Sequence, residues 1–114
     1  MAGQERRVYE RAPYFGRVTV SIPAHAPPVE GRTMDISLGG VGLSCPVSSA
    51  IRSGESIAVT FHLVQPRSGP VEERLLGRVA WIRTEAQCCL LGIEFLEPVH
   101  PVLNPAVTRL IERL

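Results

Sequence analysis

The longest strict alternation of apolar with polar or small side chains in this chain runs from residue 56 to residue 63. Its apolar positions are Ile57, Val59, Phe61 and Leu63. A period of two is typical of a half-buried β-strand, because successive side chains point to opposite faces of a sheet. The same period recurs in further short stretches, so we expect a β-sheet to form the core.

Six strands are expected in all, with no helical segment between them. They cover Val18–Ile22, Val29–Asp35, Val41–Cys45 and residues 56–63, 71–83 and 89–95. Consecutive short strands joined by turns form antiparallel sheets, and a small sheet removes its exposed edges most simply by closing into a barrel. The predicted fold class is therefore all-β, a six-stranded antiparallel β-barrel of the split-barrel type.

The two ends of the chain do not share this pattern, and we divide the chain into residues 1–16, 17–97 and 98–114. The first segment is charged and turn-prone, and we expect a flexible arm. The last has Asn104 where a helix cap is expected, Pro105 at the first helical position, and apolar residues at helical spacing. A helix of about 11 residues is not stable alone in water, so its apolar face must pack on the barrel or on a partner.

Charge and composition restrict the classes of partner. With 12 basic and 11 acidic residues, the net charge of +1 provides no general attraction for nucleic acid or an anionic membrane. Every basic residue is Arg, which grips phosphates and guanine edges in pairs, although a Lys-free chain also results from genome base composition. The polar N-terminus and the lack of an apolar run of about 18 residues favour a cytoplasmic protein without membrane insertion. Three cysteines without CxxC spacing indicate reduced, apolar strand residues.

The arm carries an RxxxR motif at Arg7 and Arg11, with Arg6 directly before it. The same spacing recurs at residues 74–78 and 109–113, so the spacing alone has little specificity. What distinguishes the first copy is its place in an arm rather than in a strand or on a helix face. The alternative is a solvated, charged terminus.

A second motif, D-x-S-x-x-G, is formed by Asp35, Ser37 and Gly40, and Asp35 is the only Asp of the chain. A carboxylate accepts hydrogen bonds from N–H donors, and a hydroxyl adds a second polar contact. Gly40 removes a side chain where a ligand or a tight turn needs access to the backbone. The alternative is an Asx or Ser turn that only shapes the connection between two strands.

Together, the arm and the turn, in this order and at this separation, resemble the PilZ domain family. Residues 77–81 and 91–95 also look like the paired late strands of that family, and the C-terminal helix is in its usual place. The resemblance covers nearly the whole chain, so the three segments are expected to form one PilZ domain. It implies a six-stranded barrel that binds cyclic di-GMP.

The resemblance also implies a ligand site, which consists of Arg6, Arg7, Arg11, Asp35, Ser37, Gly40 and Trp81. An Arg directly before RxxxR accompanies two stacked ligand molecules in the family, so Arg6 favours a stacked dimer of cyclic di-GMP. Trp81 is the only Trp, and it either lies against a purine or packs in the core or at the rim of the barrel. We expect the arm to be mobile in the free protein and to fold over the barrel when ligand binds.

Other functions have less support in the sequence. One Asp and three scattered His offer no arrangement of nucleophile, base and orienting carboxylate, so we expect no enzyme and no cofactor. The His and Cys spacings do not suit zinc. Binding of single-stranded nucleic acid would need a basic groove with several exposed aromatic residues, and aromatics are only 5% of the chain. The main alternative is an adaptor of the same fold that acts through a protein partner without ligand.

Overall fold

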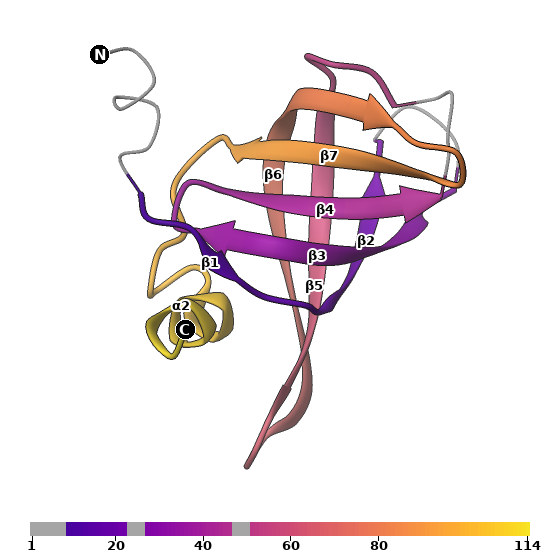
Figure 1. Ribbon diagram of the computed structural model, residues 1–114. Coiled ribbons are helices and arrows are strands. Elements are labelled where there is room, and N and C mark those ends of the chain that lie inside the picture. Colours follow the sequence, from indigo (N-terminus) through magenta and orange to yellow (C-terminus); the bar gives the residue numbers. More distant parts are fainter. Residues whose placement is uncertain (1–8, 23–26, 47–50) are drawn as a thin grey trace.

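The computed structural model describes residues 9–22, 27–46 and 51–114. Figure 1 shows its elements, which are β1 (Ala12–Pro13), β2 (Arg17–Ser21), β3 (Val29–Ser37), β4 (Gly40–Pro46), β5 (Ser56–Gln65), β6 (Gly69–Thr84), β7 (Cys88–Phe95) and α2 (Pro105–Glu112). Every strand pairing is antiparallel. No helix among the described residues is long and apolar enough to cross a membrane.

Six of the strands close into a barrel. Their order is β3-β2-β5-β6-β7-β4, and β4 pairs back with β3, so each of the six strands has a neighbour on both sides. In Figure 1, β3, β4 and β7 cross in front of the long β5 and β6, whose hairpin extends beyond the rest of the barrel. The predicted six-stranded antiparallel barrel is confirmed.

A further strand, β1, lies in the segment for which the sequence predicted only an arm. Ala12 pairs with Ile36 and Pro13 with Asp35, along the part of the β3 edge that β2 leaves open. The backbone N–H of Tyr14 then donates to the carbonyl oxygen of Met34 at 3.1 Å. Two residues, one of them Pro, are too few to show a period of two, which is why the sequence pattern did not reveal this strand.

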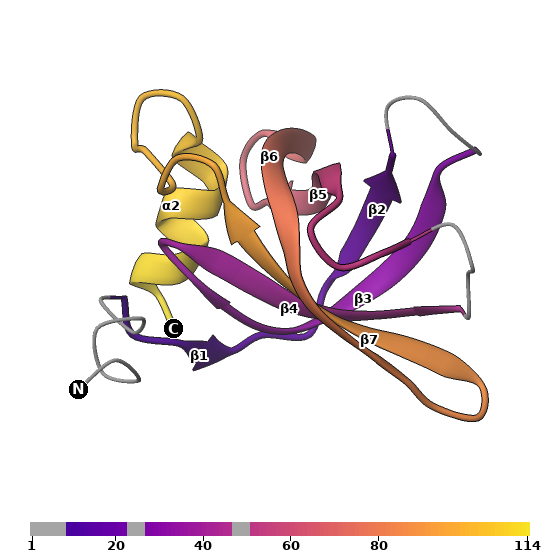
Figure 2. The same cartoon turned by 90° about the horizontal axis from the view of Figure 1, so that it is seen from above.

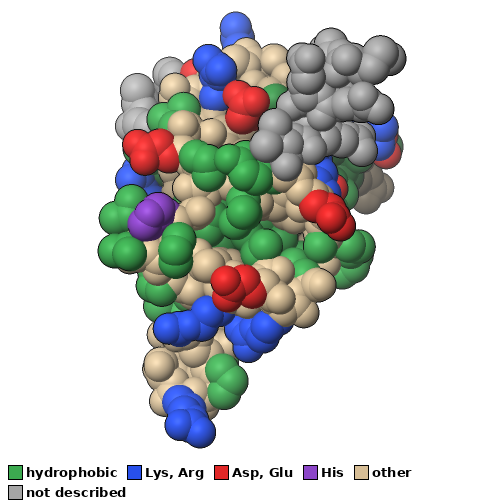
Figure 3. All heavy atoms as spheres, turned by 90° about the vertical axis from the view of Figure 1, so that its left-hand side faces the viewer, with side chains coloured by type: hydrophobic (Ala, Val, Ile, Leu, Met, Phe, Trp, Pro, Cys, Tyr) green, Lys and Arg blue, Asp and Glu red, His purple; other side chains and the backbone are tan. Residues whose placement is uncertain are grey.

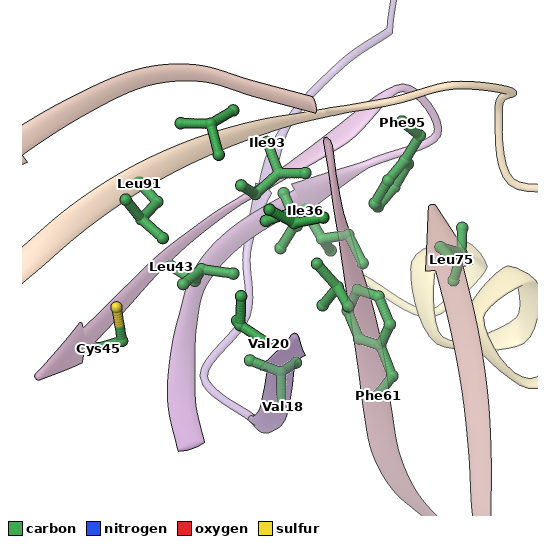
Figure 4. Packing of buried hydrophobic residues seen from close by; sticks show 14 of the residues in the cluster. Val18, Val20, Ile36, Leu43, Cys45, Phe61, Leu75, Leu91, Ile93 and Phe95 are labelled. Carbon is green, nitrogen blue, oxygen red and sulfur yellow. The ribbon is translucent and has the colours of Figure 1, made fainter. Parts of the chain in front are cut away.

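The core consists of the inward-facing side chains of the barrel strands (Figure 4). Phe61 of β5 lies at its centre, fully buried, and its ring meets Phe95 edge-to-face with the centroids 6.4 Å apart. Burying one such side chain stabilises a fold by roughly 1.5–3 kcal/mol. Cys45 and Cys89 are buried in the same cluster as free thiols, in agreement with their predicted role as apolar strand residues.

The C-terminal helix α2 begins where the sequence placed it, but a different residue caps it. Asn104 occupies the cap position without a capping hydrogen bond, and its side-chain oxygen accepts from the backbone N–H of His100 at 3.2 Å. The carboxylate of Glu73 on β6 accepts instead from the N–H groups of Ala106 and Val107, at 2.7 and 2.8 Å. The predicted cap position is therefore correct, but the oxygen atoms that accept from the first turn belong to Glu73, 33 positions before Ala106 in the sequence.

α2 lies on the side of the molecule that also carries the turn between β3 and β4, as Figures 1 and 2 both show. Figure 3 views that side and shows hydrophobic side chains gathered across its middle, with charged groups around them. The connection between β7 and α2 contributes Leu96, Val102 and Leu103, which are 60%, 77% and 69% exposed. Single exposed apolar residues are ordinary in a folded protein, and these three lie within one stretch of eight residues.

Candidate functional site

The D-x-S-x-x-G motif forms the hairpin between β3 and β4. Ser37 ends β3, Gly40 begins β4, and the two residues pair. The buried hydroxyl of Ser37 accepts from the N–H of Gly39 at 3.1 Å and lies 3.5 Å from the carbonyl oxygen of Gly40. A side chain at Gly40 would collide with the carbonyl oxygen of Ile93 on β7. Ser37 and Gly40 therefore both stabilise the geometry of this turn, in addition to any contact with a ligand.

Asp35 and Arg11 come together beside that turn. The Oδ1 atom of Asp35 accepts from the N–H of Gly42 at 3.0 Å and lies 3.5 Å from a guanidinium nitrogen of Arg11. Both side chains remain partly open to solvent, 35% for Asp35 and 44% for Arg11. The other carboxylate oxygen, Oδ2, has no partner within the described ranges. Asp35 thus presents an available acceptor next to a cation.

A β-bulge turns Asp35 outward. Thr33 and Ile36 are both buried, yet they are three positions apart, which regular alternation forbids. The pairing of β3 with β4 shifts between Thr33 and Asp35, so that Met34 is the extra residue. Bulges often re-aim a side chain in this way. Without the shift Asp35 would point into the core.

A second bulge does the same for Trp81. The pairing of β6 with β7 shifts between Val79 and Trp81, with Ala80 as the extra residue. Val79 on one side of the shift is buried, whereas Trp81 is 41% exposed on the outer face. Trp81 is therefore not a core residue, and the indole is available at the surface. The burial pattern of β6 shows the effect of this bulge, since the inward positions change from odd to even numbers between Val79 and Ile82.

Two glycines connect Asp35 to Trp81 across the sheet. Asp35 pairs with Gly42 of β4, Gly42 pairs with Gly92 of β7, and Gly92 pairs with Trp81 of β6. We call Gly42 and Gly92 the glycine strip. A side chain at Gly42 would lie 2.7 Å from the Asp35 carboxylate, and one at Gly92 would overlap the Trp81 indole. Three strand spacings, roughly 14 Å in total, separate the carboxylate strand from the indole strand.

The start of the described chain lies against the same turn. The ring of Tyr9 covers Gly39, where an added side chain would come within 2.6 Å of it. This contact brings the end of the RxxxR motif to the hairpin that carries Ser37 and Gly40. Arg6 and Arg7, the other predicted ligand residues of the arm, lie outside the described residues.

The structure thus brings Arg11, Asp35, Ser37 and Gly40 together at one turn and places Trp81 across the glycine strip from them. The sequence analysis missed the two glycines of the strip. Their signal was present, because Gly42 lies between two inward apolar residues of β4 and Gly92 between two of β7. A glycine at an outward position of a strand marks a place where another group approaches the backbone.

A different polar cluster lies on the outer face of β2, β5 and β6. The Nε2 atom of His62 is 2.6 Å from the Thr19 hydroxyl, and its Nδ1 atom is 3.0 Å from the Glu72 carboxylate. The sequence analysis found no such arrangement, because its members are cross-strand neighbours far apart in the chain. It links three strands by side-chain contacts. Among the residues that the structure describes, no group of three His, Cys, Asp or Glu suits a metal ion.

Comparison with protein families gives one match: the model described as the PilZ domain matches residues 5–113. No curated protein matches the chain.

Solved structures that are similar to the chain include the following three. The inhibitor of motility MotI/DgrA of Bacillus subtilis has 18% sequence identity and a TM-score of 0.72, with 95% of this chain and 51% of that one covered. The PilZ domain with c-di-GMP of YcgR from Escherichia coli has 20% identity and a TM-score of 0.71, covering 96% and 91%. Crystalline YcgR from Escherichia coli in complex with c-di-GMP has 21% identity and a TM-score of 0.64, covering 95% and 45%. The chain thus spans about half the length of the MotI/DgrA chain and of the longer YcgR chain.

Proposed function

Because the chain belongs to the PilZ domain family, we propose that it is a receptor for cyclic di-GMP, which binds on the outer face of the barrel beside the β3–β4 turn. The observation that carries this proposal is the meeting of Arg11 with Asp35 at the D-x-S-x-x-G hairpin. The similar YcgR structures hold c-di-GMP, which supports the choice of ligand. The proposed site consists of Arg6, Arg7, Arg11, Asp35, Ser37, Gly40 and Trp81.

The Arg11–Asp35 pair suits a ligand that carries both phosphates and guanines. An ion pair this exposed contributes only about 0–1 kcal/mol to stability, so a ligand can replace it at little cost. A phosphate of the ligand then accepts hydrogen bonds from the Arg11 guanidinium, and the N–H groups of a guanine donate to the carboxylate of Asp35. Each group exchanges a weak, solvated contact for a charge-assisted hydrogen bond.

The glycine strip lets the side chains of Asp35 and Trp81 lie close to the sheet. The Asp35 carboxylate lies over Gly42 and the Trp81 indole lies over Gly92, so a purine on this face would contact these two side chains. Stacking of a base on an aromatic side chain contributes roughly 1–3 kcal/mol. Arg6, directly before the RxxxR motif, supports a stacked dimer of cyclic di-GMP as the bound form.

The signal would be the ordering of the arm. In the structure, Ala12 and Pro13 already pair with β3, so we place the ligand-dependent change in the residues before Ala12. Binding through Arg7 and Arg11 would fix this segment on the barrel and create a new surface there. Hydrogen exchange should show protection of these amides only with ligand, and equal protection in both states would contradict this step.

Calorimetric titration with cyclic di-GMP tests the proposal, because it yields affinity and stoichiometry together. Losing one charge-assisted hydrogen bond costs roughly 1.5–3 kcal/mol, so Arg11→Ala should weaken binding about 10- to 100-fold. Asp35→Asn should do the same, and its side-chain oxygen can still accept from Gly42. Arg74 belongs to the repeat of the RxxxR spacing at residues 74–78 and is exposed on β6, so Arg74→Ala should leave the affinity unchanged.

Two ligand molecules per chain would support the stacked dimer and the role of Arg6. A wild-type protein without any binding would contradict the receptor and favour the alternative, an adaptor that acts through a protein partner. The exposed Leu96, Val102 and Leu103 would be the first surface to test in that case.

A further inference from the structure

Arg32 belongs to neither motif, yet it lies on the same outer face as Asp35. Glu30 and Arg32 are exposed and Gly31 and Thr33 are buried, so Arg32 points away from the core. The bulge at Met34 then turns Asp35 to the same side. In a strand without this bulge, two residues three positions apart would face opposite sides. The bulge therefore puts Arg32 and Asp35 on the same outer face of β3.

Arg11 approaches Asp35 from the other direction. β1 runs antiparallel to β3 with Ala12 opposite Ile36, so Arg11 precedes it near the Ser37 end of β3. Arg32 lies toward the opposite end of the same strand. The acceptor carboxylate of Asp35 is thus flanked along β3 by one guanidinium group on each side.

The charges around Arg32 are not balanced within the described ranges. Its partner on β2 is Arg17 and its partner on β4 is Ser44, so a second cation lies directly across the sheet. Arg17 has an acidic partner, since its Nε atom lies 3.5 Å from the Oε2 atom of Glu30. No carboxylate of the described residues lies within 4.0 Å of Arg32. Like charges on opposite strand positions destabilise a sheet, so this pair favours an anion beside it.

By contrast, the cations on the far side of the glycine strip have partners. Arg78 lies 3.5 Å from Glu94, and Arg83 lies 3.2 Å from Glu85. Among the described arginines of β3, β6 and β7 near the strip, Arg32 is therefore the one without a carboxylate within 4.0 Å.

We propose that Arg32 is a further ligand-binding residue, whose guanidinium binds one phosphate of the cyclic dinucleotide on the side of Asp35 opposite Arg11. This inference rests on the proposed function. A cyclic dinucleotide carries two phosphates on opposite sides of one ring, with guanines projecting from it. Two guanidinium groups that flank a guanine-binding carboxylate match that arrangement, and each can hold a phosphate with two parallel hydrogen bonds.

The test is calorimetric titration of the full chain with cyclic di-GMP, using Arg32→Ala, Arg32→Lys and Arg74→Ala. Arg74 is the matched control, because it is also an exposed, strand-borne Arg with no carboxylate within 4.0 Å in the described part of the chain. Arg74 lies roughly 20 Å from Trp81 along β6, and this strand pairs with β5 and β7 rather than with β3 or β4. We expect Arg32→Ala to weaken binding about 10- to 100-fold, Arg32→Lys less, and Arg74→Ala less than about twofold.

Thermal unfolding without ligand separates binding from stability. Because Arg32 faces Arg17, its replacement by Ala should leave the melting temperature unchanged or raise it, while ligand affinity falls. If wild type binds and Arg32→Ala binds equally well, the role of Arg32 is refuted and the receptor function stands. If Arg32→Ala loses affinity only in proportion to a lower melting temperature, its role is structural and the inference fails. If wild type does not bind at all, the receptor function itself fails.

Discussion

The carboxylate of Glu73 joins the C-terminal helix to the barrel, and its removal should be among the most damaging single changes outside the core. Its two oxygens accept from the N–H groups of Ala106 and Val107 at 2.7 and 2.8 Å. These N–H groups lie in the first turn of α2, where helical donors have no partner within the helix. Asn104 cannot take over without giving up its hydrogen bond to His100.

The size of the effect follows from these contacts. Hydrogen bonds to a charged group contribute roughly 1.5–3 kcal/mol each, and a negative charge at a helix N-terminus adds about 0.3–1 kcal/mol. Because Glu73 is only half-buried and water can replace part of the loss, we expect Glu73→Ala to lower the free energy of unfolding by about 2–4 kcal/mol. Glu73→Gln keeps one oxygen acceptor and should cost about 1–2 kcal/mol.

Urea denaturation followed by far-ultraviolet circular dichroism measures this difference. The control is Glu97→Gln, which removes the same charge from an exposed position and should change the free energy of unfolding by less than about 0.5 kcal/mol. Hydrogen exchange should also show faster exchange of the first-turn amides of α2 in Glu73→Ala. The reasoning is refuted if Glu73→Ala unfolds at the same urea concentration as the Glu97 variant.

Two further predictions concern the glycine strip and the buried thiols. Gly92→Ala should displace the Trp81 indole, lower the free energy of unfolding by roughly 1–3 kcal/mol and change the emission of this single Trp, so an unchanged spectrum would count against the contact. Burial, together with the neighbouring Cys89 and Cys88, raises the pKa of Cys45 from 9.0 to about 11, so the native thiol keeps its proton where the unfolded one has lost it. The stability from this group is therefore complete below pH 9 and is lost as the pH rises to about 11. Urea titrations from pH 8 to 11 should show a shallower decline for Cys45→Ala than for wild type, and parallel curves would contradict the assignment.

Much of the fold was predictable because hydrophobic periodicity is a local property. The alternation over residues 56–63 and 89–95 identified two barrel strands near their true ends, and Pro105 marked the start of α2. The resemblance to the PilZ family rested on motifs whose residues are close together in the sequence. Of these, Asp35, Ser37 and Gly40 lie together at the β3–β4 hairpin.

The sequence alone determined that this chain would be an antiparallel barrel with the D-x-S-x-x-G turn on it, because both depend on side chains close together in the chain. The tertiary structure decided which way Asp35 and Trp81 point, since one bulged residue reverses the alternation that the sequence pattern displays. It also decided which residues lie across the sheet from one another, as with Gly42 and Gly92, and Arg17 and Arg32. Strand register depends on how the whole core packs, and only the closed barrel brings such distant residues to one surface.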